Sequence, residues 1–185
     1  MDVDVVRRAQ RGDREAFDML AAGAYDRLFV LAQRILRESE PSKDAVQECL
    51  VQAWRGLRTL RDASRWDAWL QRLLVNACYQ EARRARNHSR ELRSLPLQHA
   101  APGDATADLA DRDQLERGFR RLPVEQRAVL VLHHYLGLRL PEIAELLGVP
   151  EGTVRSRLHY ATGAMRAALE ADARSVRFAA EGRPA

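Results

Sequence analysis

The chain has 185 residues, of which 30 are Lys or Arg and 26 are Asp or Glu, so its formal net charge is +4. Its length allows one ordinary domain or two small ones, and 46% hydrophobic with only 6% aromatic residues predicts an aliphatic core. No stretch approaches the ~20 apolar residues of a membrane span, the acidic start does not resemble a signal peptide, and Cys49 and Cys78 are isolated, forming neither a metal pair nor a disulfide framework. These features predict a soluble protein of the reducing cytoplasm.

Apolar side chains recur every three or four positions along residues 1–93, which is the pattern of amphipathic helices that pack on a core. Asp13 and Ser42 precede two of these segments and are suitable N-caps. Trp66 and Trp69 lie on the inward stripe of the last segment. The predicted helices cover about residues 3–10, 25–36, 42–57 and 65–86.

The composition changes after residue 93. Residues 94–111 contain three aspartates, no Lys or Arg, two prolines and a glycine, so they predict a flexible acidic linker. Helical spacing resumes over residues 112–170, where Pro123 suits the first position of a helix that is apolar on most sides. Residues 171–185 are too few for a domain, and we expect a disordered tail. The predicted fold class is all-α, with two small helical domains, residues 1–93 and 112–170.

The segment from Leu140 to Met165 has the pattern of a helix-turn-helix. Apolar residues anchor one side of each of two short helices, and Gly148 permits the turn between them. A second helix that is anchored on one side and offers Arg, Ser and His on the other suits reading of the DNA major groove. From this segment alone, an ordinary helical hairpin with a solvated face is the alternative. The outward and edge positions of the second helix are Thr153, Arg155, Ser156, Arg157, His159 and Tyr160.

Four stretches in order, taken together, resemble the extracytoplasmic-function (ECF) group of bacterial RNA polymerase sigma factors across nearly the whole chain. They are Arg7-RAQRGDREAFDML, Asp44-AVQECLVQAW, Trp66-DAWLQRLLVNACYQEARR and Leu122-PVEQRAVLVLHHYLGLRLPEIAELLGVPEGTVRSRL. The resemblance implies a sigma-2-like domain for core polymerase docking and for recognition and melting of the minus-ten element. It also implies a sigma-4-like domain for recognition of the minus-thirty-five element.

By this resemblance, the helix that contains Asp44 docks on the coiled-coil of the polymerase beta-prime subunit. A mixed stripe on that helix, opposite the inward-facing Val46 and Leu50, agrees with partner recognition by fixed polar groups, although a solvated face is the alternative. The docking residues are expected to be Asp44, Gln47, Glu48, Val51 and Arg55.

The resemblance assigns the minus-ten element to a loop at about residues 58–66 and the helix after it. Arg can contact phosphate there, while Asn, Ser and Tyr can bond to or stack on an unpaired base. Trp66 and Trp69 are expected in the core rather than as stacking platforms. The candidates are Arg61, Ser64, Arg65, Arg72, Asn76, Tyr79, Gln80, Arg83 and Arg84. A basic track would continue along the DNA backbone through Arg86, Arg90 and Arg93, unless these residues are only a solvated helix end.

The resemblance assigns the second helix of the helix-turn-helix to the minus-thirty-five element. Arg155, Ser156 and His159 are the base-edge candidates, whereas Thr153 and Arg157 are better placed for phosphate. The apolar helices before it would also contact the flap of the polymerase beta subunit. An anti-sigma factor is a further partner that is common in the family, although no segment of this chain specifies one.

The sequence departs from the family pattern at three places. Pro41 and Lys43 stand where relatives have acids before the docking helix, which predicts weaker docking. One hypothesis is that phosphorylation of Ser42 restores negative charge at this helix N-terminus. Tyr160 and Thr162 replace common arginines, which predicts weaker phosphate contact, and Gln80 replaces a common Asp.

A stand-alone helix-turn-helix regulator, which binds operator DNA without polymerase, is the alternative function. No catalytic set is convincing, so the sequence predicts a protein that is not an enzyme and that has no small-molecule substrate, cofactor or membrane insertion. His133 and His134 do not predict a metal site, because neighbouring residues on a helix point about 100° apart. No carboxylate or cysteine completes a ligand set beside them.

Overall fold

A computed structural model describes residues 2–92 and 118–181, and within these ranges every regular element is a helix. The prediction of an all-α chain is therefore confirmed for the described residues. Among them, no helix combines the length and the apolar character that crossing a membrane requires. The helices are α1 (Val3–Gln10), α2 (Arg14–Leu36), α3 (Ser39–Gly56), α4 (Trp66–Leu92), α6 (Val124–His134), α7 (Leu140–Leu147) and α8 (Glu151–Glu181), with 3-10 turns η1 (Leu57–Thr59) and η2 (Ala63–Arg65).

Local capping explains how α1 and α2 begin. The Asp2 carboxylate accepts a hydrogen bond from the Asp4 amide, and the Asp13 carboxylate accepts one from the Ala16 amide at 3.0 Å. The predicted cap at Asp13 is therefore confirmed. α2 ends at Leu36, and the cap residue that follows, Arg37, adopts the left-handed conformation at φ 67° without being a glycine.

The expected N-cap at Ser42 is wrong, because α3 already begins at Ser39 with Glu38 as its cap residue. Pro41 does not delay the helix, since the first amides of a helix have no intrahelical partner in any case. The Ser42 hydroxyl instead donates to the Glu38 carbonyl at 2.5 Å and is fully buried.

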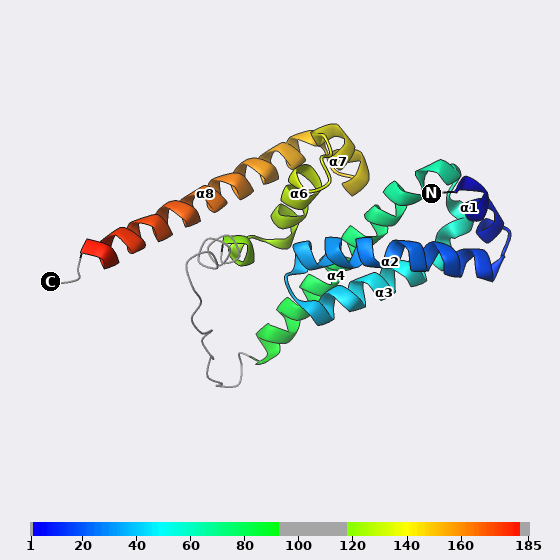
Figure 1. The fold of residues 1–185 in the computed structure, drawn as a ribbon, viewed down its shortest axis with the longest axis horizontal. Helices are drawn as coiled ribbons and strands as arrows, with labels where there is room; N and C mark the ends of the chain where they lie inside the picture. The colour runs from blue at the N-terminus through cyan, green and yellow to red at the C-terminus, as the bar shows by residue number, and fades with distance from the viewer. Residues whose placement is uncertain (1, 93–117, 182–185) are drawn as a thin grey trace.

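The first core lies where α2 and α3, side by side in Figure 1, pack on α4. Ile35, Leu70 and Leu74 are almost fully removed from water, and each such side chain contributes about 1.5 to 3 kcal/mol. Trp66 is also fully buried, so its predicted core position is confirmed, whereas Trp69 is only partly buried.

The second group of helices is built around α6, whose five consecutive residues 128–132 are all buried. Gly148 ends α7 in the left-handed conformation at φ 65°, which makes the predicted turn before α8. Ile143 and Val154 are fully buried on the facing sides of α7 and α8. α8 is far longer than the short helix expected, because no proline interrupts it, and it extends away from the other helices in Figure 1. It continues to Glu181, into the segment expected to be a tail.

The two groups of helices touch each other. α2 contacts α6, and α4 contacts both α6 and α7. One apolar cluster runs through all of these helices and includes Val131, Leu132 and Ile143 together with the core of α1–α4. The Arg34 guanidinium lies 3.9 Å from the ring centre of Tyr135, adding a cation-π contact between α2 and the end of α6. The predicted linker, residues 94–111, lies outside the described residues.

Candidate functional site

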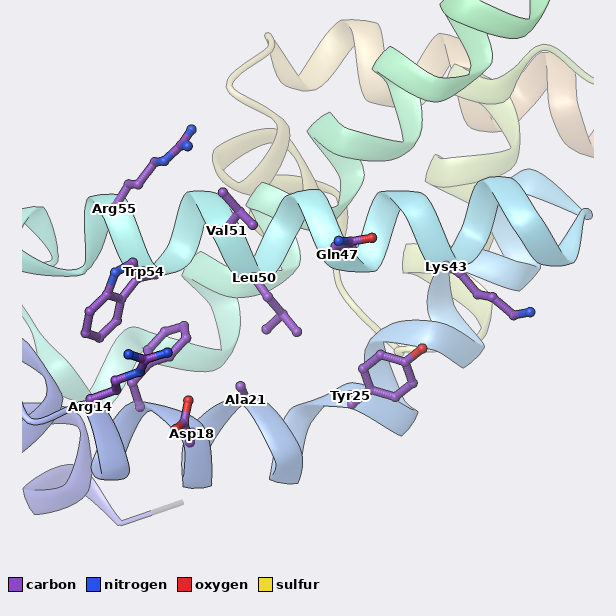
Figure 2. A pocket seen from close by; sticks show the side chains of 11 residues that line it. Arg14, Asp18, Ala21, Tyr25, Lys43, Gln47, Leu50, Val51, Trp54 and Arg55 are labelled. Carbon is purple, nitrogen blue, oxygen red and sulfur yellow. The ribbon is translucent and has the colours of Figure 1, made fainter.

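A groove of about 790 Å³ runs between α2 and α3 (Figure 2). Its floor is apolar: Phe17 and Trp54 meet edge to face with ring centres 4.9 Å apart, and Leu50 points toward α2 beside them. Trp54 is nevertheless 44% exposed, so a large aromatic surface remains open to solvent. The charged side chains at the groove are Arg14, Asp18, Lys43 and Arg55.

The structure brings three of the five predicted docking residues into this groove, namely Gln47, Val51 and Arg55. Asp44 is exposed on α3 but does not line the groove. Glu48 is partly buried, and its carboxylate accepts a hydrogen bond from Gln52 Nε2 at 2.7 Å within the same helix.

Sequence reasoning missed the aromatic part of the groove. Leu50 was expected in the core opposite the docking stripe, but it is only partly buried and lines the groove. Gln47, Leu50 and Trp54 follow helical spacing as a second stripe, so the signal was present in the sequence.

Lys43 and Ser42 lie where the sequence departs from the family pattern before the docking residues. Lys43 Nζ lies 2.6 Å from Glu40 Oε1, and this hydrogen bond raises the pKa of the lysine. The Ser42 hydroxyl is fully buried and donates to the Glu38 carbonyl, so a kinase cannot reach it in this conformation, which counts against the phosphorylation hypothesis.

The loop between α3 and α4 is held by two side chains. Gln10 of α1 reaches across the chain, and its Nε2 donates to the carbonyls of Leu60 at 2.6 Å and Leu57 at 3.3 Å. Asp62 accepts from both the amide and the hydroxyl of Ser64, at 2.9 and 2.7 Å. These bonds to Ser64 lower the pKa of the Asp62 carboxyl. Sequence reasoning missed Gln10, because its partners lie about 50 positions further along the chain.

Most of the predicted minus-ten residues are exposed. Arg72, Asn76, Gln80 and Arg83 follow one another along α4, and Arg61 lies exposed in the loop before it. The side chain of Arg90 and the whole of Arg93 lie outside the residues that the structure describes.

Several predicted minus-ten residues already have partners. Arg65 pairs with Glu145 of α7, and Arg84 pairs with Glu81 of its own helix. Arg86 Nη2 lies 3.7 Å from Glu125 Oε1 of α6. The Ser64 hydroxyl is engaged by Asp62, as described above.

Tyr79 is the exception on this face of α4. Its ring is partly buried, and its hydroxyl is buried without a hydrogen-bond partner among the described residues. Burial raises the pKa of this hydroxyl to about 12.

The predicted recognition face of α8 is open. Arg155, Ser156, His159 and Tyr160 are exposed, whereas Thr153 and Arg157 are partly buried. Arg155 Nη2 lies 2.7 Å from Glu151 Oε1, an exposed pair one turn apart that DNA can replace. The face thus presents side chains of the types that bond to base edges and phosphates.

His133 has a structural partner. Its Nδ1 lies 2.8 Å from the Leu138 carbonyl, which ties the end of α6 to the turn before α7. The two histidine rings meet edge to face, with centres 4.7 Å apart.

Both groups of helices match known protein families. Residues 21–88 match the family described as sigma-70 region 2, and residues 112–162 match sigma-70, region 4. The ECF RNA polymerase sigma factor SigM of Mycobacterium tuberculosis is 38% identical over 157 residues, covering 84% of this chain and 78% of the relative. RNA polymerase sigma-H factor of Pseudomonas aeruginosa is 29% identical over 181 residues, covering 91% and 94%.

Two solved structures share the fold. CnrH, in complex with the cytosolic domain of CnrY, is 26% identical with a TM-score of 0.62, covering 92% of this chain and 98% of that one. The sigma factor RpoE from Bartonella quintana, in complex with the anti-sigma factor NepR, has a TM-score of 0.63 at 22% identity, covering 84% and 98%. At that identity, the second likeness concerns the fold alone.

Proposed function

Because the chain belongs to the extracytoplasmic-function (ECF) group of the sigma-70 family, we propose that its first domain docks on core RNA polymerase and engages the minus-ten element, while its second domain reads the minus-thirty-five element. The protein is a sigma factor, a subunit that is not an enzyme and that directs polymerase to promoters for initiation. The stand-alone regulator accounts only for the second domain, whereas the region 2 match covers residues 21–88.

The groove between α2 and α3 is the proposed docking site for the beta-prime coiled-coil. An exposed aromatic ring over an apolar floor, surrounded by charges of both signs, is the composition of a binding hot spot with a polar rim. Gln47, Val51 and Arg55 would contact the partner beside Trp54. Asp44 and Glu48 would act at the edge of this contact. The apolar helices of the second domain would contact the beta flap.

The loop before α4 and the exposed side of that helix are the proposed surface for the melted minus-ten strand. Gln10 and Asp62 hold the loop in one conformation before DNA binds, which lowers the entropy lost on binding. Arg61, Arg72 and Arg83 would contact backbone phosphates, while Asn76 and neighbouring polar side chains would contact an extruded base.

The exposed face of α8 is the proposed surface that reads the minus-thirty-five element. The exposure of this face is the main support for the proposed promoter recognition. The turn at Gly148 and the buried Val154 fix the inner side of α8, so that Arg155, Ser156 and His159 face a DNA groove together. Arg155 is the proposed base-edge donor.

The division of the chain remains part of the proposal: residues 1–93 and 112–170 are the domains, 94–111 the linker and 171–185 the tail, which α8 makes helical as far as Glu181. When two DNA-binding domains are on one chain, binding of the first raises the effective concentration of the second at its own DNA element. We place this action in the cytoplasm, where bacterial polymerase works. An anti-sigma protein is a proposed partner, since the similar CnrH is found with the cytosolic domain of CnrY.

Run-off transcription with purified core polymerase tests this function. Adding the protein should start transcription at a matching promoter, and Arg155→Ala should weaken that start by about five- to a hundredfold, the range of one good base contact. Arg166→Ala is the matched control, because Arg166 is exposed three turns further along α8. No core-dependent start at any candidate promoter would refute the function, and equal effects of the two variants would refute the assignment of Arg155.

A further inference from the structure

The second domain lies over the proposed minus-ten surface. A cleft of about 660 Å³ separates the two, with Arg61, Arg65 and Arg72 on the first-domain side and Glu142 and Glu145 of α7 on the other. Arg65 and Glu145 close this cleft with an ion pair. The basic groups assigned to DNA thus face carboxylates of the same chain.

The approach is close at two further points. A side-chain carbon added to Gly148 would lie 3.5 Å from Arg72 Nη2, so the end of α7 is beside that guanidinium. Tyr79, assigned to an unpaired base, is covered, and the charges of Glu125 and Arg157 act on its buried hydroxyl. Residues expected to contact DNA are therefore engaged between the domains.

We propose that α7 is an intramolecular competitor of promoter DNA: in the free protein its acidic side occupies the minus-ten surface, and the melted strand must displace it. This inference rests on the proposed function. A carboxylate and a phosphate both present oxygens that pair with a guanidinium. Glu145 therefore takes the place on Arg65 that a backbone phosphate would take. The Arg65 guanidinium cannot pair with Glu145 and with a backbone phosphate at the same time, so the closed arrangement of the domains and binding of the strand exclude each other there.

The closed arrangement is suited to being reversible. The Arg65 and Glu145 side chains are 59% and 66% exposed, and exposed pairs contribute little. The Tyr79 hydroxyl, on which the charges of Glu125 and Arg157 of the second domain act, is buried without a hydrogen-bond partner within the described ranges, and a closed form that keeps it from water is disfavoured by that unmade bond. A partner that prefers the open form can therefore shift the population.

Single-molecule energy transfer between dyes at Ala22→Cys and Thr162→Cys in the full chain measures closure directly. Both positions are exposed on different domains, while the native Cys49 and Cys78 are fully buried and do not compete for labelling. Glu145→Arg should shift the distribution toward longer distances, because it places a cation against Arg65. Tyr79→Phe should shift it toward shorter distances, because it removes the hydroxyl that lacks a partner.

Binding of a fluorescent single strand of twelve nucleotides with mixed sequence is the second measurement. Glu145→Arg should strengthen binding at least about threefold, the scale of one exposed ion pair. Glu170→Arg makes the same charge change on an exposed position of α8 outside the cleft. It should leave the distance unchanged and strengthen binding less. Unchanged distances in both Glu145→Arg and Tyr79→Phe, or equal binding by Glu145→Arg and Glu170→Arg, would overturn the competition.

These measurements need no polymerase, so they are separable from the proposed function. Normal run-off transcription with distances insensitive to Glu145→Arg would reject the competitor and retain the promoter function. Distances that respond to the variant, without any start of transcription, would retain the contact between the domains and reject the promoter function.

Discussion

Gln10→Met should loosen the minus-ten loop without disturbing the core. Methionine keeps the length and volume of the side chain, but it cannot donate to the Leu57 and Leu60 carbonyls. The bond to Leu60 is short at 2.6 Å and the bond to Leu57 is long at 3.3 Å. A hydrogen bond makes a net contribution of about 0.5 to 1.5 kcal/mol, and the long bond to Leu57 belongs at the lower end of that range, so the two together contribute about 1 to 2 kcal/mol.

This free energy becomes an additional cost of binding DNA, because the loop must then be ordered by the DNA itself. A cost of about 1 to 2 kcal/mol corresponds to roughly five- to thirtyfold weaker engagement of the minus-ten strand. The assay compares initiation at two promoters that differ in one minus-ten base, and the preference for the matching base should fall by several-fold. Amide hydrogen exchange should also quicken at Leu60, whose amide donates to Leu57 in the same turn.

Gln52→Met is the matched control, because it removes a bond from the same kind of side chain to Glu48 within α3. It should leave base preference and exchange in the loop unchanged. Base preference equal to that of the unmodified protein in Gln10→Met, or the same loss in Gln52→Met, would refute the anchoring of the loop by Gln10.

Three other predictions concern docking, the core and pH. Trp54→Ala should weaken binding to a beta-prime coiled-coil fragment by about thirtyfold in calorimetry, whereas Met19→Ala, exposed outside the groove, should not. Leu74→Ala should lower the free energy of unfolding by about 2 to 5 kcal/mol in urea titration, and a loss below about 1 kcal/mol would contradict its burial. Burial raises the pKa of Cys49 and Cys78 from 9.0 to about 12. Their thiols then deprotonate first in the unfolded state, so stability should fall as pH rises from 9 to 12, and replacing both by alanine should flatten this decline.

Much of the first domain could be predicted from periodicity and caps. The stripe of α4 correctly placed Trp66 in the core, and Asp13 marked the start of α2, because both signals act within one or two turns. The start of α3 was not predicted correctly at Ser42. Pro41 is tolerated in the first turn of a helix, so α3 begins before it and Ser42, which resembles a cap, lies inside the helix.

The exposure of a candidate residue could be predicted where it depends on a single helix. It could not be predicted where two segments far apart in the sequence meet. The exposed side of α8 follows from its own spacing, as Arg155 and His159 show. Arg65 pairs with Glu145, 80 positions further along the chain, and the charges of Glu125 and Arg157 of the second domain act on the buried Tyr79 hydroxyl. No local pattern in the sequence contains these contacts. The contacts of Gln10 could not be predicted either, because its partners are backbone carbonyls, which every residue carries and which leave no pattern in the sequence.

The apolar cluster that runs through both domains limits how freely they can be exchanged among relatives. A chimaera that joined this first domain to the second domain of another sigma factor would set unfamiliar side chains against α2 and α4, where α6 and α7 now pack. Mismatch there would leave small voids or crowding. Recombinants should therefore carry the α6 and α7 residues at this seam together with the α2 and α4 residues that they meet.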